Sequence, residues 1–203
     1  MDEEYILILY YSRQGGTAKL AEHIATGVEQ AGITARIRTV PAVSPDTEQS
    51  ADEIPEAGPM YCTQEDLAQC SGLLLGSPTR FGNMAAPLRY FWDQTSPIWL
   101  SGQLVSKPAG VFVSTSTLHG GQESTLLSMM LPLIHHGMLI TGIPFTEADM
   151  HDRTSSASPY GATHLATSDK SSATSISQQE ARLARSLGQR VAQIAINLRN
   201  THV

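Results

Sequence analysis

Cysteine and basic residues are both scarce in this sequence. Cysteine occurs only as Cys62 and Cys70, so neither a disulfide framework nor a zinc cluster is expected, and no other metal site is predicted. Lysine and arginine total 13 against 19 acidic residues, which gives a formal net charge of −6. A surface that neutralises nucleic-acid phosphates is therefore not expected.

Long apolar runs are also absent. The N-terminal segment MDEEYILILYY is acidic and its apolar run is short, unlike a basic secretory leader. No stretch approaches the roughly 18–20 apolar residues that span a bilayer. We therefore expect a cytoplasmic protein without membrane insertion. A chain of 203 residues with 41% hydrophobic residues can bury a full core, and we expect one domain over residues 1–203.

Several motifs that would fix a function are missing. The chain contains neither GxxxxGK[ST] nor GxGxxG, so triphosphate hydrolysis and the dinucleotide fingerprint both lose support. Neither GxSxG nor HExxH occurs, which removes the simplest hydrolase interpretations.

What the sequence does contain is an alternation of apolar runs and helical patterns, typical of βαβ units around a parallel sheet. Strands are expected at 5–11, 33–40, 72–76, 107–116 and 137–145. Helices are expected at 17–32, 85–95, 123–137 and 177–199. The third of these should be bent or broken near Pro132. Five strands and about five helices predict a three-layer α/β sandwich.

Some local signals refine this prediction. The segment ITARIRTV alternates apolar and polar residues, which indicates an edge strand. Residues 41–63 form an exposed loop rich in proline, serine and acidic residues, and its middle has the composition of a disordered segment. Ser177 and Glu180 match a capping box at the start of the last helix.

In such a sheet, ligands bind outside the carboxyl ends of the strands. Three polar loops follow strands there: SRQGGTA (12–18), GSPTRFGNM (76–84) and STSTLHGGQE (114–123). In the first, small residues let backbone N–H groups surround an anion at a helix N-terminus, and Ser12 and Thr17 add hydroxyls. An ordinary capped strand-to-helix turn is the alternative for that loop.

The second and third loops could hold a flat heteroaromatic ring by its edges. Arg80 would then stabilise negative charge that the ring gains on reduction. The alternative for Arg80 is a surface salt bridge, the commoner situation for a single arginine.

Five segments now add a resemblance: SPTRFGNM (77–84), WDQT with a later tryptophan (92–99), HGGQE (119–123), HHGM (135–138) and SPYGAT (158–163). Together they resemble the WrbA family of flavodoxin-like NAD(P)H:quinone oxidoreductases. The similarity runs from Tyr10 to the last helix. It implies a flavodoxin-like fold with a five-stranded parallel sheet of order 2-1-3-4-5 and an active-site insertion at 93–104.

The resemblance also implies a reaction and its reagents. FMN would be the cofactor, NADH or NADPH the co-substrate, and a quinone the substrate, reduced by two electrons in a ping-pong hydride transfer. The protein would be a homotetramer, a dimer of dimers.

By the same similarity, each loop has a role. The phosphate would bind Ser12, Arg13, Gln14, Gly15, Gly16 and Thr17. The isoalloxazine would lie against Pro78, Thr79, Arg80 and Phe81 on one side and Ser114, Thr115, Ser116, Thr117, His119 and Gly120 on the other. Arg80 and His135 are the candidate catalytic residues, and His135 would also contact the cofactor. Trp99 would wall the substrate cavity across a subunit boundary.

The chain departs from the family pattern in two places. Family loops often carry an aromatic residue and a histidine where this chain has Gln14 and Gly16. The contacts with the nicotinamide are therefore expected to differ from those of the family. Residues 168–177 replace a more regular turn, so oligomer contacts there are expected to differ.

Two other functions stay open at this point. One is a one-electron flavodoxin-type carrier, although such carriers are usually smaller and more acidic and do not need the insertion at 93–104. The other is a regulatory protein-binding partner of a transcription factor. For two histidines the structural interpretation competes with catalysis: His136 as a helix cap and His119 as a backbone contact.

Overall fold

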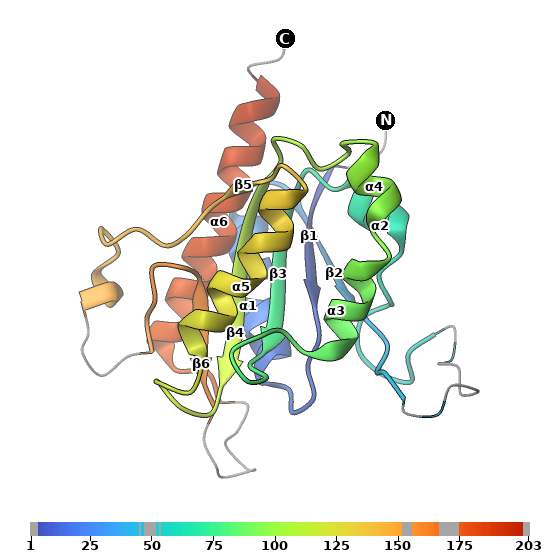
Figure 1. Ribbon diagram of the computed structural model, residues 1–203. Coiled ribbons are helices and arrows are strands. Elements are labelled where there is room, and N and C mark those ends of the chain that lie inside the picture. The colour runs from blue at the N-terminus through green and yellow to red at the C-terminus, as the bar shows by residue number, and fades with distance from the viewer. Residues whose placement is uncertain are drawn as a thin grey trace.

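The computed structural model describes residues 4–44, 46, 52, 54–151, 156–166 and 175–200. Its centre is a six-stranded parallel sheet of order β2-β1-β3-β4-β5, in which β6 also pairs with β4 (Figure 1). The strands are β1 (Tyr5–Tyr10), β2 (Thr34–Thr39), β3 (Gly72–Pro78), β4 (Pro108–Thr115), β5 (Leu139–Ile140) and β6 (Ala162–Leu165). The predicted strand order is confirmed, and β2 lies at the predicted edge.

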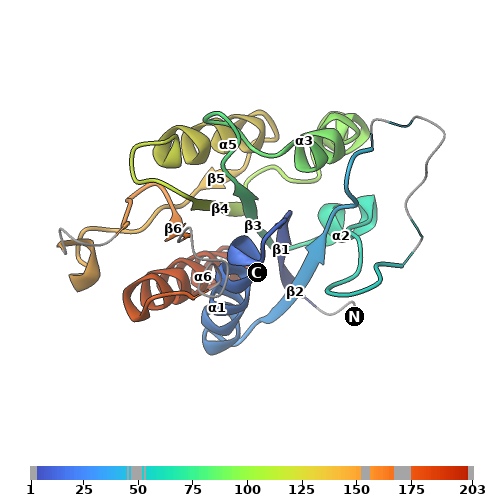
Figure 2. The ribbon, with the colours of Figure 1, turned by 90° about the horizontal axis from the view of Figure 1, so that it is seen from below.

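Helices cover both faces of this sheet, so the predicted three layers are confirmed (Figure 2). One face carries α1 (Gly16–Gln30) and α6 (Gln178–Asn200), and the other carries α3 (Ala86–Asp93) and α5 (Gln122–His135). The shorter helices are α2 (Gln64–Gln69), α4 (Ser96–Leu100) and the 3₁₀ helix η1 (Ala148–His151). None of the helices described here is long and apolar enough to cross a membrane.

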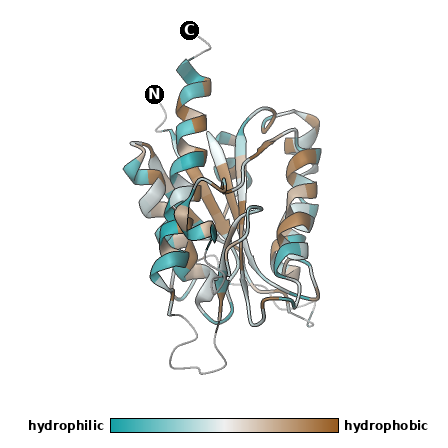
Figure 3. Ribbon diagram, turned by 90° about the vertical axis from the view of Figure 1, so that its left-hand side faces the viewer, coloured by the Kyte–Doolittle hydropathy of each residue, from teal (hydrophilic) through white to brown (hydrophobic). Residues whose placement is uncertain are grey.

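The alternation of side chains along β1 explains the two cores. Leu7 and Leu9 pack with the residues of α3 and α5, whereas Ile6 and Ile8 pack with those of α1 and α6. All four are fully buried. A strand covered on both faces needs apolar residues at every position, which is why YILILY is a continuous apolar run. Figure 3 shows the same contrast between apolar strands and the mixed surface of α6, the helix that leads to the C label.

Two segments of the chain share the fifth position of the sheet. β5 pairs with Pro108 and Ala109, and β6 pairs with the later residues of β4. The strand predicted at 137–145 is therefore wrong beyond Ile140. Pro144 has no N–H to give, and the N–H of Ile143 bonds the carbonyl of Pro159 at 2.9 Å instead of β4.

Two helix predictions have informative outcomes, one confirmed and one not. Ser177 and Glu180 form the expected capping box: the N–H of Glu180 bonds Ser177 Oγ at 3.2 Å, and the N–H of Ser177 bonds Glu180 Oε2 at 2.8 Å. Near Pro132 a bend or a break was predicted, and the helix is not broken there, because α5 continues through Pro132 to His135.

The long connection after β2 is exposed where it is described. Ile54 and Met60 are 64% and 49% exposed. The middle of this loop, where disorder was predicted, lies largely outside the described residues, as do residues 168–174 of the variable turn.

Candidate functional site

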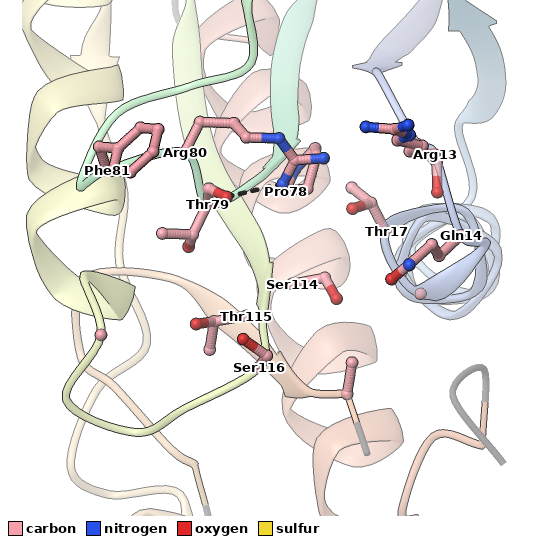
Figure 4. A pocket seen from close by; sticks show the side chains of 14 residues that line it. Arg13, Gln14, Thr17, Pro78, Thr79, Arg80, Phe81, Ser114, Thr115 and Ser116 are labelled. Carbon is pink, nitrogen blue, oxygen red and sulfur yellow. Dashed lines mark hydrogen bonds between the residues drawn. The ribbon is translucent and has the colours of Figure 1, made fainter. Parts of the chain in front are cut away.

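The loops after β1, β3 and β4 meet at the carboxyl end of the sheet and enclose a pocket of about 260 Å³ (Figure 4). Thirteen of the fourteen residues that line it were predicted from the sequence: Ser12, Arg13, Gln14, Gly16, Thr17, Pro78, Thr79, Arg80, Phe81, Ser114, Thr115, Ser116 and Gly120. The convergence follows from the parallel sheet, because β1, β3 and β4 are adjacent and end on the same side.

The first loop leads directly into α1 and leaves the start of that helix open. Gly15 is the N-cap, at a φ of +90°, and no side chain caps the helix. The Gly15 N–H bonds Ser12 Oγ at 3.1 Å, which closes the turn. Unpaired N–H groups at a helix start attract an anion. Thr17, which is 1% exposed, adds a hydroxyl that points into the pocket (Figure 4).

The second loop is a tight turn. Arg80 and Asn83 exchange two backbone hydrogen bonds of 2.9 Å, and the residues between them, Phe81 and Gly82, have φ values of +50° and +78°. Positive φ at both central positions is typical of a type I′ turn. Ser128 Oγ of α5 donates to the Thr125 carbonyl at 2.9 Å and lies 3.4 Å from the Gly82 carbonyl, so α5 packs close to the turn.

Arg80 extends from this turn across the mouth of the pocket toward Arg13 (Figure 4). Its Nη1 donates to the Thr79 carbonyl at 2.8 Å. Within the described part of the chain, no carboxylate forms an ion pair with Arg80. Among these residues its guanidinium bonds only the backbone, and its charge faces the pocket opening.

The third loop begins where β3 and β4 lie side by side. The Thr79 N–H bonds the Ser114 carbonyl at 2.9 Å. Ser114 and Thr115 are both buried, whereas Ser116 is exposed. The loop ends at Gly121, the N-cap of α5, which has a φ of +98° and again no side-chain cap. Hydroxyl donors and the start of a second helix thus lie beside the pocket.

These groups fit the phosphate end of FMN. The first turn of α1, the hydroxyl of Thr17 and the guanidinium of Arg13 are all donors suited to a phosphate. The cradle is shaped around Gly16: a Cβ there would lie 2.7 Å from Ser114 Oγ and 2.9 Å from His164 Cδ2. Only glycine leaves that space clear.

Five of the predicted site residues do not line the pocket. Gly15 caps α1, and Thr117 and His119 lie exposed in the third loop. Trp99 and His135 line a separate groove of about 490 Å³ between α3, α4 and α5. There Trp99 Nε1 donates to the His135 carbonyl at 2.9 Å.

The separation of His135 from the pocket is set by α5. This helix has 14 residues, and at 1.5 Å per residue it spans about 20 Å. Its first turn borders the pocket and its last residue is His135 (Figure 1). Within one protomer, His135 and Trp99 therefore lie apart from the residues that line this pocket.

His136 has the structural role that was predicted for it. It is the C-cap of α5 and is 8% exposed, with Nε2 at 3.0 Å from Thr95 Oγ1. The Thr95 hydroxyl donates to the Trp92 carbonyl at 2.8 Å, so the Nε2 of His136 carries the proton that Thr95 accepts. Burial, and then the neighbouring His135, lower the pKa of His136, which keeps its ring neutral.

Sequence reasoning missed three residues behind or beside the pocket. Ala166 lines it, and His164 and Glu180 form a buried pair behind Gly16. The capping-box pattern identified Glu180, but nothing in the sequence paired it with a histidine. His164 lies in the four-residue strand β6, and Ala166 directly follows it. This segment is too short and too polar to be recognised as a strand from sequence.

Comparison with known proteins gives consistent results. Residues 5–147 match the family model described as NADPH-dependent FMN reductase. A curated protein of Gluconacetobacter diazotrophicus named NAD(P)H dehydrogenase (quinone) is 42% identical over 95% of this chain and 98% of its own length. A protein of the same name from Solidesulfovibrio magneticus is 40% identical over 96% of this chain and 98% of its own length.

Solved structures agree on the fold. A flavodoxin described as WrbA-like, from Agrobacterium tumefaciens, matches with a TM-score of 0.67 at 22% identity, over 96% of this chain and 99% of that one. The chain therefore belongs to the NADPH-dependent FMN reductase family, as a flavodoxin-like relative of the NAD(P)H:quinone oxidoreductases that its sequence resembles.

Proposed function

We propose that this protein is an FMN-dependent NAD(P)H dehydrogenase that reduces quinones to hydroquinones by two electrons. One observation carries the proposal. Three loops, predicted from sequence to hold a flavin, converge on one pocket in a chain 42% identical to a protein named NAD(P)H dehydrogenase (quinone). Bound FMN would supply the chemistry, accepting hydride from NADH or NADPH and passing it to a quinone.

The residues of the first loop would bind the phosphate. The first N–H groups of α1 and the hydroxyl of Thr17 donate to it, and Arg13 supplies a positive charge. Ser12 acts through the backbone, because its oxygen already accepts the Gly15 N–H and holds the turn. Gly16 has no side chain, so the helix start can pack closely against Ser114 and the His164 ring.

The other two loops would hold the ring. The turn from Arg80 to Asn83 is closed by its own backbone bonds, so its shape does not depend on a ligand. Such a preorganised rim loses little entropy on binding. The Arg80 guanidinium at the pocket mouth would stabilise negative charge on the reduced ring, and Ser114 and Thr115 would bond its polar edge.

We propose that the working unit is a homotetramer, a dimer of dimers, in which a neighbouring protomer brings Trp99 and His135 to the pocket. Two observations support this. Both residues lie at the far end of α5 from their own pocket, and the nearby helices expose apolar side chains: Leu100, Leu127, Leu131 and Ile134. An apolar face of this kind is typical of an interface.

We further propose a single domain over residues 1–203 and a cytoplasmic location. The two cysteines are unpaired, which fits a reducing compartment. Burial raises the pKa of both thiols, so neither is activated for redox chemistry.

An anaerobic titration tests the proposed activity. The protein is loaded with FMN, NADH is added, and the flavin absorbance is followed before and after addition of benzoquinone. We expect NADH to bleach the bound flavin and benzoquinone to restore its absorbance, with one hydroquinone formed per NADH. Bound FMN that NADH does not bleach would instead favour the carrier or the regulatory function.

A further inference from the structure

Gly16, the first residue of α1, is backed by a histidine from the opposite end of the sequence. A Cβ at position 16 would lie 2.9 Å from His164 Cδ2 and 3.3 Å from His164 Nε2. Both contacts are tighter than ordinary van der Waals distances. His164 belongs to β6 and is 1% exposed. The wall behind the first turn of α1 is therefore the edge of an imidazole ring.

This ring is anchored on its other side. His164 Nδ1 lies 3.3 Å from both carboxylate oxygens of Glu180. Glu180 is itself fixed by three donors: the Leu165 N–H at 2.8 Å, the Ser177 N–H at 2.8 Å and Ser156 Oγ at 3.1 Å. The anchor thus joins β6 to the first turn of α6.

Glu180 is charged in this arrangement. Burial alone would raise its pKa, but hydrogen bonds from His164 and from the N–H groups of Leu165 and Ser177 outweigh burial and lower the pKa to about 2. A buried carboxylate with these partners holds its donors firmly. Ser114, the other neighbour of Gly16, differs: its Oγ can turn away about χ1, whereas the ring of His164 cannot yield without breaking its contact with Glu180.

We propose that His164 is a positioning residue for the cofactor phosphate: anchored by Glu180, its ring fixes Gly16 and with it the direction of the first N–H groups of α1. The inference rests on the proposed function, since it assumes that FMN phosphate binds at this helix start. His164 does not line the pocket, so it acts through Gly16 rather than by touching the ligand.

The arrangement predicts that the effect of a larger residue at position 16 depends on the size of the side chain at position 164. Gly16 has no positive φ, and alanine is the better helix former, so Gly16→Ala should be harmless to the helix itself. The harm comes from the collision with His164, which must displace the loop. His164→Asn removes the ring edge that faces Gly16, while the Asn side-chain amide still donates to Glu180.

A double-mutant cycle tests this, with flavin fluorescence quenching as the measurement. The dissociation constants of FMN and of riboflavin, which lacks the phosphate, are measured for the natural protein, Gly16→Ala, His164→Asn and the double variant. We expect Gly16→Ala to weaken FMN binding by about ten- to hundredfold, since small displacements of a binding group have effects of that order. Riboflavin binding should change much less.

In the His164→Asn background, we expect Gly16→Ala to weaken FMN binding by less than about threefold, because contacting positions are not additive. His151→Asn, the same change at an exposed histidine of η1 outside the pocket, is the matched control, and in that background the full loss should persist. Glu180→Gln gives a second test that does not alter the ring: a weaker anchor lets His164 yield, so the effect of Gly16→Ala should shrink there too.

If Gly16→Ala weakens FMN binding equally in the natural protein and in every variant background, the positioning role of His164 is overturned. So would an equal loss of riboflavin affinity, which would indicate general damage to the pocket. If the natural protein does not bind FMN at all, the proposed function itself fails. If it binds FMN but the cycle shows no coupling, only the role of His164 fails. Melting temperatures of all variants identify any that have not folded.

Discussion

At the scale of single residues, the turn from Arg80 to Asn83 explains why a charged side chain follows a buried strand. β3 ends at Pro78, and the next residues fold back on themselves through two backbone hydrogen bonds. The turn places Phe81, fully exposed, at the rim of the pocket and directs Arg80 across its mouth (Figure 4). A cation held there by the backbone is placed to act on charge that develops in a ligand.

Replacing Arg80 with alanine tests that role. We expect the rate constant for reduction of bound FMN by NADH to fall by about ten- to hundredfold, because a preorganised charge is lost where negative charge develops. Stopped-flow absorbance under anaerobic conditions measures it. Arg190→Ala, which removes an exposed arginine from α6, is the matched control. Reduction at the natural rate in Arg80→Ala would show that the guanidinium does not assist hydride transfer.

At the scale of elements, periodicity predicted the layers and the family resemblance implied the strand order, but neither predicted the return of the chain at β6. GMLITGIPF reads as one apolar strand, and only the bond from Ile143 to Pro159, sixteen positions later in the chain, takes it out of the sheet. The pocket loops were predictable because they follow strong apolar runs. His164 was not, since its role depends on contacts with Gly16 and Glu180, which are distant in sequence.

The short helix α2, also missed from sequence, is joined to the edge of the sheet through Asp66. This carboxylate caps its own helix with Thr63 and pairs with Arg36 and Arg38 of β2, both at 3.1 Å. Arg36 also stacks on the Tyr5 ring at 3.5 Å. Burial alone would raise the pKa of Asp66, but hydrogen bonds from Thr63 and Arg38 outweigh it, and the pKa is lowered.

Asp66→Asn should therefore destabilise the protein in a pH-dependent way. A lowered folded-state pKa means that the carboxylate stabilises the fold above its unfolded pKa, and that this stabilisation is lost as the pH falls through the folded value. We expect the variant to lose about 1–3 kcal/mol of unfolding free energy at pH 7, and the difference to narrow in acid. Urea unfolding at several pH values measures this. A difference independent of pH would rule out the charge as its source.

At the scale of the whole molecule, one face is unusually apolar. α5 exposes Leu127, Leu131 and Ile134, each about half exposed, while its buried side faces the sheet. Much of this helix is hydrophobic in Figure 3. Trp99 is also half exposed at its end. A chain that leaves its candidate substrate wall at the surface, away from its own pocket, is consistent with the proposed sharing of sites between protomers.

Leu131→Glu tests the proposed assembly. A charge in the centre of the apolar face carries a large desolvation cost in any interface formed there. We expect sedimentation velocity to show dissociation of the natural assembly, and FMN to bind more weakly because the neighbouring protomer no longer brings His135 to the pocket. Ile54→Glu, a like change at an exposed residue of the loop after β2, is the control. If Leu131→Glu still assembles like the natural protein, the interface does not lie on this apolar face.

The late position of β6 has a consequence for synthesis on the ribosome. The loops after β1, β3 and β4 are complete once residue 123 has left the exit tunnel, but the wall behind Gly16 arrives only with His164, and its anchor only with Glu180. A nascent chain stalled before residue 162 would carry every donor proposed for the phosphate and still lack the part that aligns them. Retention of flavin by the emerging chain would then mark the moment at which translation has passed α6.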